Sequence, residues 1–114
     1  MFRAGRTGTV TARYDVVNTA VPSVPVTPWT TLELGYLDPA GGAVSATLFQ
    51  VDPCTGKTTP ICTAVSFAST APQCVVCTFA ANTMNYLTNL YFVQVNITRG
   101  VTTVNPQSFT LRIF

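Results

Sequence analysis

The chain has 114 residues and a mass of 12.2 kDa, a size that suits one domain built around a single core. Charged residues make up only 9% of it, and the net charge of +2 comes without any run of basic residues. The basic residues are therefore too scattered for the cationic cluster that nucleic-acid binding requires, and this disfavours such a function. No apolar stretch approaches the roughly 20 residues that are needed to cross a bilayer.

Threonine, valine and alanine are the commonest residues, which favours an all-β domain. Threonine and valine are β-branched and prefer pleated, half-buried strands to helices. With so few charges, the neutral hydroxyl groups of threonine must supply most of the polar surface.

The first strand is expected over residues 8–17, "GTVTARYDVV", where apolar and polar residues alternate. Val10, Ala12, Tyr14 and Val16 share one face. The following stretch, "NTAVPSVPVTP", has a proline at every third position, which is the period of a polyproline II turn. It predicts a stiff connector that takes no place in a central strand.

Six more strands follow, separated by turn sequences such as "DPAGG" and "DPCTGK". They are expected over residues 29–37, 43–51, 59–67, 74–79, 90–99 and 107–114, and "NTMNYLTN" is expected to be a loop or one short helical turn. The run "LYFVQVNITR" is apolar enough on both faces to be central in its sheet. In the last strand the alternation points Phe109, Leu111 and Ile113 inward.

Residues 8–114 therefore predict one antiparallel β-sandwich of about seven to eight strands, jelly-roll or immunoglobulin-like in topology. Residues 1–7 form a separate, extended N-terminal arm. The spacing of strands does not distinguish the two topologies.

No catalytic, cofactor-binding or metal-binding residues are expected. The chain has no histidine, which removes the usual general base and the usual nitrogen ligand of zinc. Asp38 and Asp52 precede prolines in turns, where aspartate makes local hydrogen bonds, and Asp15 and Glu33 occupy polar positions of strands. We therefore expect that the protein is not an enzyme.

The four cysteines, Cys54, Cys62, Cys74 and Cys77, are candidates for disulfides. A zinc site usually has two close pairs of cysteines on tight turns, and only "CVVC" is close here. The same motif shows no helix start that would activate a redox thiol. A hairpin centred near residue 68 would place Cys62 opposite Cys74, leaving Cys54 for Cys77 within or between subunits. In a strand, Cys74 and Cys77 point to opposite faces.

The N-terminal arm, "MFRAGRT", has the composition of a docking segment. Phe2 is one large apolar anchor, and Arg3 and Arg6 can reach acceptors on a partner surface. Such an arm can enter a groove or extend the sheet of a neighbouring copy, or it can fold back on its own domain. The chain also has a single lysine, Lys57, in a turn, so its edge strands lack the charges that protect monomers from pairing.

In its short, threonine- and valine-rich sequence, with "MFRAGRTGTV" ahead of the first strand and "FVQVNITRG" near the end, the chain resembles subunits of bacterial endospore appendages. The resemblance implies jelly-roll subunits that polymerise by sheet augmentation and connector docking, with disulfide cross-links. Connectors of that family usually contain cysteine, whereas nothing before Cys54 is a cysteine here. Covalent linkage through this arm is therefore excluded.

The expected function is thus a structural subunit that assembles with copies of itself into an extracellular or spore-surface fibre. The N-terminus lacks the apolar core of a secretory signal, so we expect either a signal already removed or release by lysis. Two alternatives remain open at this point: a monomeric immunoglobulin-like adhesion or binding module, with a ligand near Trp29 or Tyr36, and a viral capsid or decoration protein. The protein is expected neither to bind nucleic acid nor to span a membrane.

Overall fold

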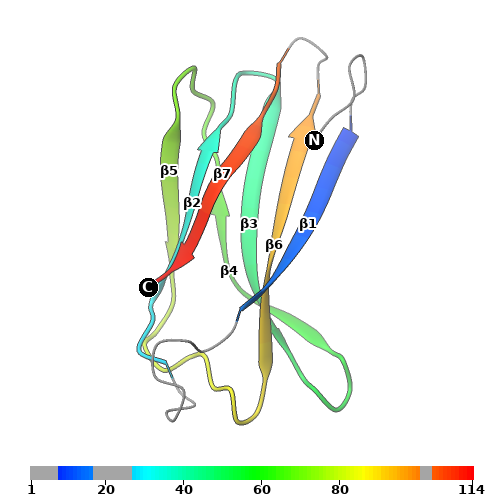
Figure 1. Ribbon diagram of the computed structural model, residues 1–114, viewed down its shortest axis with the longest axis vertical. Coiled ribbons are helices and arrows are strands. Elements are labelled where there is room, and N and C mark those ends of the chain that lie inside the picture. The colour runs from blue at the N-terminus through cyan, green and yellow to red at the C-terminus, as the bar shows by residue number, and fades with distance from the viewer. Residues whose placement is uncertain (1–7, 17–26, 101–103) are drawn as a thin grey trace.

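The computed structural model describes residues 8–16, 27–100 and 104–114, and these form seven strands in two antiparallel sheets without a helix. Figure 1 shows the two sheets packed face to face. The strands are β1 (Gly8–Val16), β2 (Thr31–Leu37), β3 (Gly42–Val51), β4 (Thr58–Val65), β5 (Gln73–Thr78), β6 (Leu90–Arg99) and β7 (Gln107–Ile113). The predicted all-β sandwich and the positions of its seven strands along the sequence are confirmed. The proline-rich connector falls largely on residues 17–26, outside the described part.

The first sheet has the strand order β1-β6-β3-β4. β6 pairs along its whole length with β1 on one side and β3 on the other. The expectation that residues 90–99 form a central strand is therefore confirmed. Of this strand, Tyr91, Val93 and Val95 are buried in the core, while Phe92 stacks on Phe49 of β3 on the opposite face.

The second sheet has the strand order β5-β2-β7, with β2 in the centre. Leu32, Leu34 and Tyr36 of β2 are almost fully buried, as the alternation predicts. The register between β2 and β7 shifts at Gly35/Tyr36, so that Tyr36 pairs with Ser108 while Gly35 pairs with Thr110. Phe109 is the extra residue of this bulge, a feature that twists a strand and redirects its side chains.

The core lies between the two sheets and is completed by one loop. Its buried members from the first sheet include Val44, Ala46 and Leu48 of β3. Met84 is also fully buried, although it belongs to the stretch "NTMNYLTN" that lacks any strand or helix period. That stretch is the expected loop, and it covers one end of the sandwich.

The strand order identifies the topology more closely than the sequence does. An immunoglobulin sandwich pairs its first strand with its second, whereas β1 and β2 lie in different sheets here. A jelly roll of strands B to I forms the sheets C-H-E-F and B-I-D-G. β1-β6-β3-β4 matches C-H-E-F, and β7-β2-β5 matches I-D-G. Among the described residues, the position of strand B, beside β7, is empty.

The outer face of the first sheet is coated with neutral polar groups, as expected from the threonine content. Hydroxyl groups of Thr9 and Thr98 lie 3.0 Å apart, and Thr11 donates to the amide oxygen of Asn96 at 2.8 Å. Thr47 and Thr63 make a similar cross-strand contact at 3.0 Å. These pairs link neighbouring strands without any charge.

Candidate assembly surfaces

A cavity of about 510 Å³ opens between β1 and β7, on the side of the sandwich where strand B of a jelly roll would lie. Its floor is formed by core side chains from both sheets, and its walls are the last residues of β1 and most of β7. The described residues that line it are Tyr14, Asp15, Val16, Trp29, Leu32, Val93, Ser108, Phe109, Thr110, Leu111, Arg112 and Ile113. Among the described residues, the cavity thus reaches from the surface to the core, whose residues Leu32 and Val93 are themselves buried.

Two aromatic side chains beside this cavity are exposed although the alternation of their strands points them inward. Tyr14 is 54% exposed and Phe109 is 50% exposed. Inward positions of a sandwich are normally covered by the facing sheet, and here the cover would come from a strand next to β7. The prediction that Phe109 is buried is wrong, because it lies in the bulge of a strand that has no neighbour on its outer side among the described residues.

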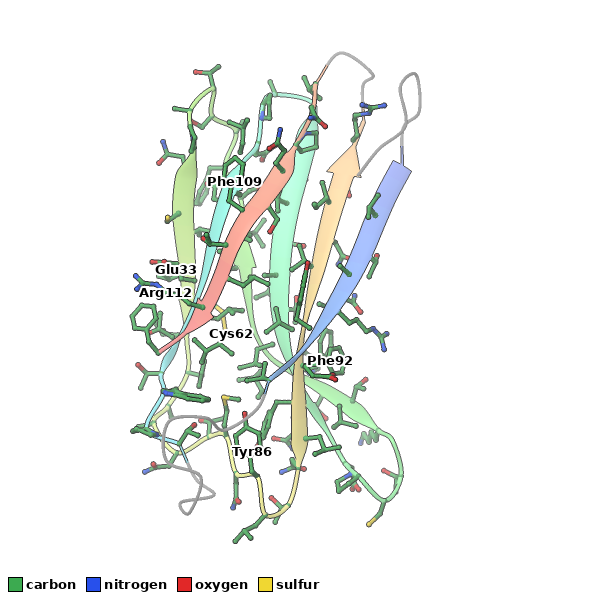
Figure 2. All side chains as sticks on the ribbon, in the orientation of Figure 1. Glu33, Cys62, Tyr86, Phe92, Phe109 and Arg112 are labelled. Atoms are coloured by element: carbon green, nitrogen blue, oxygen red, sulfur yellow. A yellow bond between two sulfur atoms is a disulfide. The ribbon has the colours of Figure 1, made fainter. Side chains whose placement is uncertain are left out.

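The polar groups near the cavity include one ion pair and one carboxylate. Arg112 donates to Glu33 of β2 at 2.7 Å, and Figure 2 shows the two side chains together on the outer face of the second sheet. The hydrogen bond and the negative charge of Glu33 both raise the pKa of Arg112 above its usual value. The guanidinium also lies over the ring of Phe114, 4.5 Å from its centre. Asp15 supplies the carboxylate at the rim of the cavity.

One end of the cavity is held by a tyrosine pair. The hydroxyl of Tyr86 donates to the carbonyl of Val16 at 3.2 Å, which fixes the end of β1. Its ring packs edge-on against Tyr91, with the ring centres 5.1 Å apart. Burial, and to a lesser extent the neighbouring Tyr91, raises the pKa of Tyr86 to about 12.

The opposite side of the sandwich is closed by a disulfide between Cys62 of β4 and Cys77 of β5. The Cα atoms lie 5.9 Å apart, and the bond joins the two sheets through their interior (Figure 2). The expected pairing of Cys62 with Cys74 is wrong, as is that of Cys54 with Cys77. β4 and β5 do not form a hairpin: residues 66–72 cross from one sheet to the other, so Cys62 faces Leu48 and Cys74 faces Gly35.

Cys54 and Cys74 are both free and exposed. Cys54 lies in the turn between β3 and β4, where Asp52 accepts hydrogen bonds from the backbone N–H of Cys54 at 2.8 Å and of Thr55 at 3.3 Å. The local hydrogen bonding expected of Asp52 is thus confirmed. Cys74 lies near the start of β5 and is exposed while Cys77 is bonded inward, as expected for positions three apart in a strand.

Asp38 makes contacts that the turn sequence "DPAGG" does not predict. It is buried, at 3% exposure, and accepts a hydrogen bond of 2.6 Å from the hydroxyl of Ser66, which itself accepts from the backbone N–H of Val44 at 2.9 Å. Its backbone carbonyl accepts from the N–H of Ser69 at 2.8 Å. Asp38 therefore anchors the segment that crosses between the sheets, and no local pattern in the sequence reveals this.

The edge strands of both sheets expose apolar side chains. On β4, Val65 is 54% exposed, and on β5, Val76 is 48% exposed. Phe67, just after β4, is more exposed still. Lys57 lies in the turn before β4, so it places no charge on the edge strands β4 and β5 themselves. The docking residues expected in the arm, Phe2, Arg3 and Arg6, lie outside the described residues.

Within the part of the chain that the structure describes, no three cysteine, aspartate or glutamate side chains are grouped so that they could hold a metal ion. The same residues contain no helix long and apolar enough to span a membrane. Asp15, Glu33, Asp38 and Asp52 lie at separate places in the fold, at the cavity rim, in an ion pair, in the core and in a turn.

No family model matches the chain, and no curated protein or solved structure is detectably similar to it. Its function is therefore inferred from the surfaces described above.

Proposed function

We propose that this chain is a structural subunit that assembles with copies of itself into an extracellular or spore-surface fibre. In this proposal, edge strands of neighbouring copies pair, the N-terminal arm docks on another copy, and disulfides stiffen the polymer. The protein carries out no reaction, and its surfaces serve assembly alone.

The observation that best supports this proposal is that the edge strands β4 and β5 expose apolar side chains and carry no lysine. Strands at sheet edges present unpaired backbone groups, and monomers usually protect them with charges, especially lysine. Val65 and Val76 instead place exposed valines on β4 and β5, and the only lysine lies in a turn. Such edges are suited to pairing with another strand.

The free cysteines support the covalent part of the proposal. Cys54 and Cys74 are exposed and unused within the subunit, so they are available to partners. When two such thiols on different copies join, they lose two protons and two electrons to dioxygen, which becomes hydrogen peroxide. This chemistry belongs to an oxidising compartment, as does the internal disulfide.

The proposal is tested by sedimentation and negative-stain electron microscopy of the purified chain. We expect filaments from the unmodified protein and much shorter ones from Val65→Lys or Val76→Lys, since each adds a charge to an edge strand. Thr47→Lys adds the same charge to the outer face of the central strand β3 and should leave assembly unchanged. A dispersed 12.2 kDa species under all conditions would refute the proposal.

A second function, that of a monomeric binding module, is favoured by one observation. The cavity between β1 and β7 has a volume of about 510 Å³ and is lined by Trp29, and pockets of roughly 300–1,000 Å³ accommodate small ligands. Tyr36, the other aromatic residue considered for a ligand, is buried in the core. This function requires a monomer that binds a small molecule and quenches the fluorescence of Trp29.

A further inference from the structure

The open side of the sandwich has the form of a jelly roll from which one edge strand is missing. β7 pairs with β2 on one side, and within the described residues no strand pairs with it on the other. The cavity lies along this free edge. By contrast, the opposite side is closed by the Cys62–Cys77 disulfide.

The free edge of β7 and the cavity beside it form a slot, which offers an incoming strand both backbone hydrogen bonds and apolar contacts. The outer edge of β7 presents backbone N–H and C=O groups that a strand can pair with, and such pairing supplies affinity in strand addition. The lining offers apolar side chains that are only partly buried, among them Val16, Leu111 and Ile113, to one face of that strand. A suitable occupant is extended, with an apolar side chain at alternate positions.

We propose that the slot is filled by residues 1–7 of a second copy, lying antiparallel to β7 as an eighth strand. This inference rests on the proposed function, since it requires that copies associate. In the sequence "MFRAGRT", Phe2, Ala4 and Arg6 share one face of an extended strand. Phe2 and Ala4 would face the apolar lining, and Arg6 would lie opposite the exposed Phe109. With Phe2 opposite Ile113, its ring would enter the cavity, whose lining includes Trp29 and Ile113.

Charge and length also favour this occupant. The arm carries two arginines and no acid, and Asp15 places a carboxylate at the rim of the cavity. In this register Arg3 lies opposite Arg112, whose positive charge is balanced by its ion pair with Glu33. In this register the seven arm residues lie opposite residues 108–114, which include six of the seven residues of β7. Strand B of a jelly roll also lies antiparallel to its neighbour, so the proposed strand completes the fold with its ordinary geometry.

The arm of the same copy does not fit the slot equally well. It enters β1 at Gly8, which pairs with Arg99 at the far end of the sheet from Tyr14 and Val16. Crossing the roughly 10 Å between the sheets takes about three of its seven residues. The remaining four residues would reach only the first half of β7, leaving the cavity beside Val16 and Ile113 uncovered. The arm of another copy is free of this restriction.

Disulfide trapping in the full chain tests the inference. In a background carrying Cys54→Ser and Cys74→Ser, one preparation carries Gly5→Cys and a second, with a mass tag, carries Thr110→Cys. The proposed register places residue 5 opposite residue 110, and Thr110 is exposed. A matched control replaces Thr110→Cys by Thr63→Cys, an equally exposed threonine on the edge strand β4.

After mixing and mild oxidation, we expect the Gly5→Cys chain to bond to the Thr110→Cys chain on the order of tenfold more than to the Thr63→Cys chain, because docking raises the local thiol concentration. Equal yields, or a cross-link formed only within a chain that carries both Gly5→Cys and Thr110→Cys, would overturn the inference. Filaments that form without the selective cross-link contradict the inference alone, whereas a dispersed monomer contradicts the proposed function as well.

Discussion

Cys62 and Cys77 join the two sheets of the sandwich on one side, with their Cα atoms 5.9 Å apart, while no such link exists between the described parts of β1 and β7 on the other. One side of the core is covalently closed and the other has a cavity of about 510 Å³. The described domain is therefore asymmetric, with the disulfide on one side and the cavity on the other.

The disulfide should contribute substantially to stability. Replacing both Cys62 and Cys77 by alanine removes a link that closes a loop of 15 residues, and a loop of that size is worth about 3 kcal/mol in the chain-entropy account. We expect the midpoint of urea unfolding to fall accordingly. The matched pair Cys54→Ser with Cys74→Ser should leave it unchanged, and thiol labelling of the unreduced, unfolded chain should count two free thiols.

The hydroxyl of Ser66 should matter more than its partial exposure indicates. Ser66→Ala leaves the buried Asp38 carboxylate without its donor and the N–H of Val44 without its acceptor, which should destabilise the domain by about 2–3 kcal/mol. Thermal unfolding measures this cost. Ser69→Ala removes two exposed hydrogen bonds, from the N–H of Ala71 at 3.2 Å and from the amide of Gln73 at 3.5 Å, and should cost much less. An equal loss from both variants would show that Asp38 does not depend on Ser66.

The raised pKa of Tyr86 predicts a loss of stability in alkali. Because its pKa is about 12 in the folded chain and about 10 in the unfolded chain, the folded state holds its proton more tightly. The stabilisation is therefore complete below pH 10 and is lost as the pH rises from 10 towards 12. Since the ring is partly exposed, we expect a loss of only about 1 kcal/mol.

This effect is measured by urea unfolding at pH 8 and pH 11 in the background lacking Cys54 and Cys74, which avoids thiol exchange. The Tyr86→Phe variant, which has no hydroxyl to titrate, should lose less stability over this interval. Parallel losses in the two proteins would contradict the assignment.

Gly35 of β2 leaves no room for a side chain, because Thr110 of the neighbouring strand β7 lies against it. A Cβ atom at this position would collide with Oγ1 of Thr110, so Gly35→Ala should destabilise the domain by about 1–3 kcal/mol. Adding Thr110→Ala removes the colliding oxygen and should recover part of that loss. A double-mutant cycle by chemical unfolding gives the coupling, and additive effects would show that the collision is relieved in another way.

The sequence by itself determined the all-β class and the place of each strand, because alternation and turn residues are local signals. It also indicated that residues 90–99 form a central strand, since both faces of that run carry residues suited to burial. The opposite orientation of Cys74 and Cys77 followed from the two-residue period of a strand, and the hydrogen bonds of Asp52 from its place in a turn.

Only the tertiary structure decided which sheet each strand joins. Alternation fixes the face of a residue but carries no information on whether successive strands pair or cross to the other layer, and for that reason the sequence predicts the wrong partner for Cys62. For the same reason the sequence does not predict the role of Asp38, because its hydroxyl partner lies 28 residues away. Strand order depends on long-range packing of both layers at once, so only the tertiary structure shows that β7 has β2 as its one partner among the described strands.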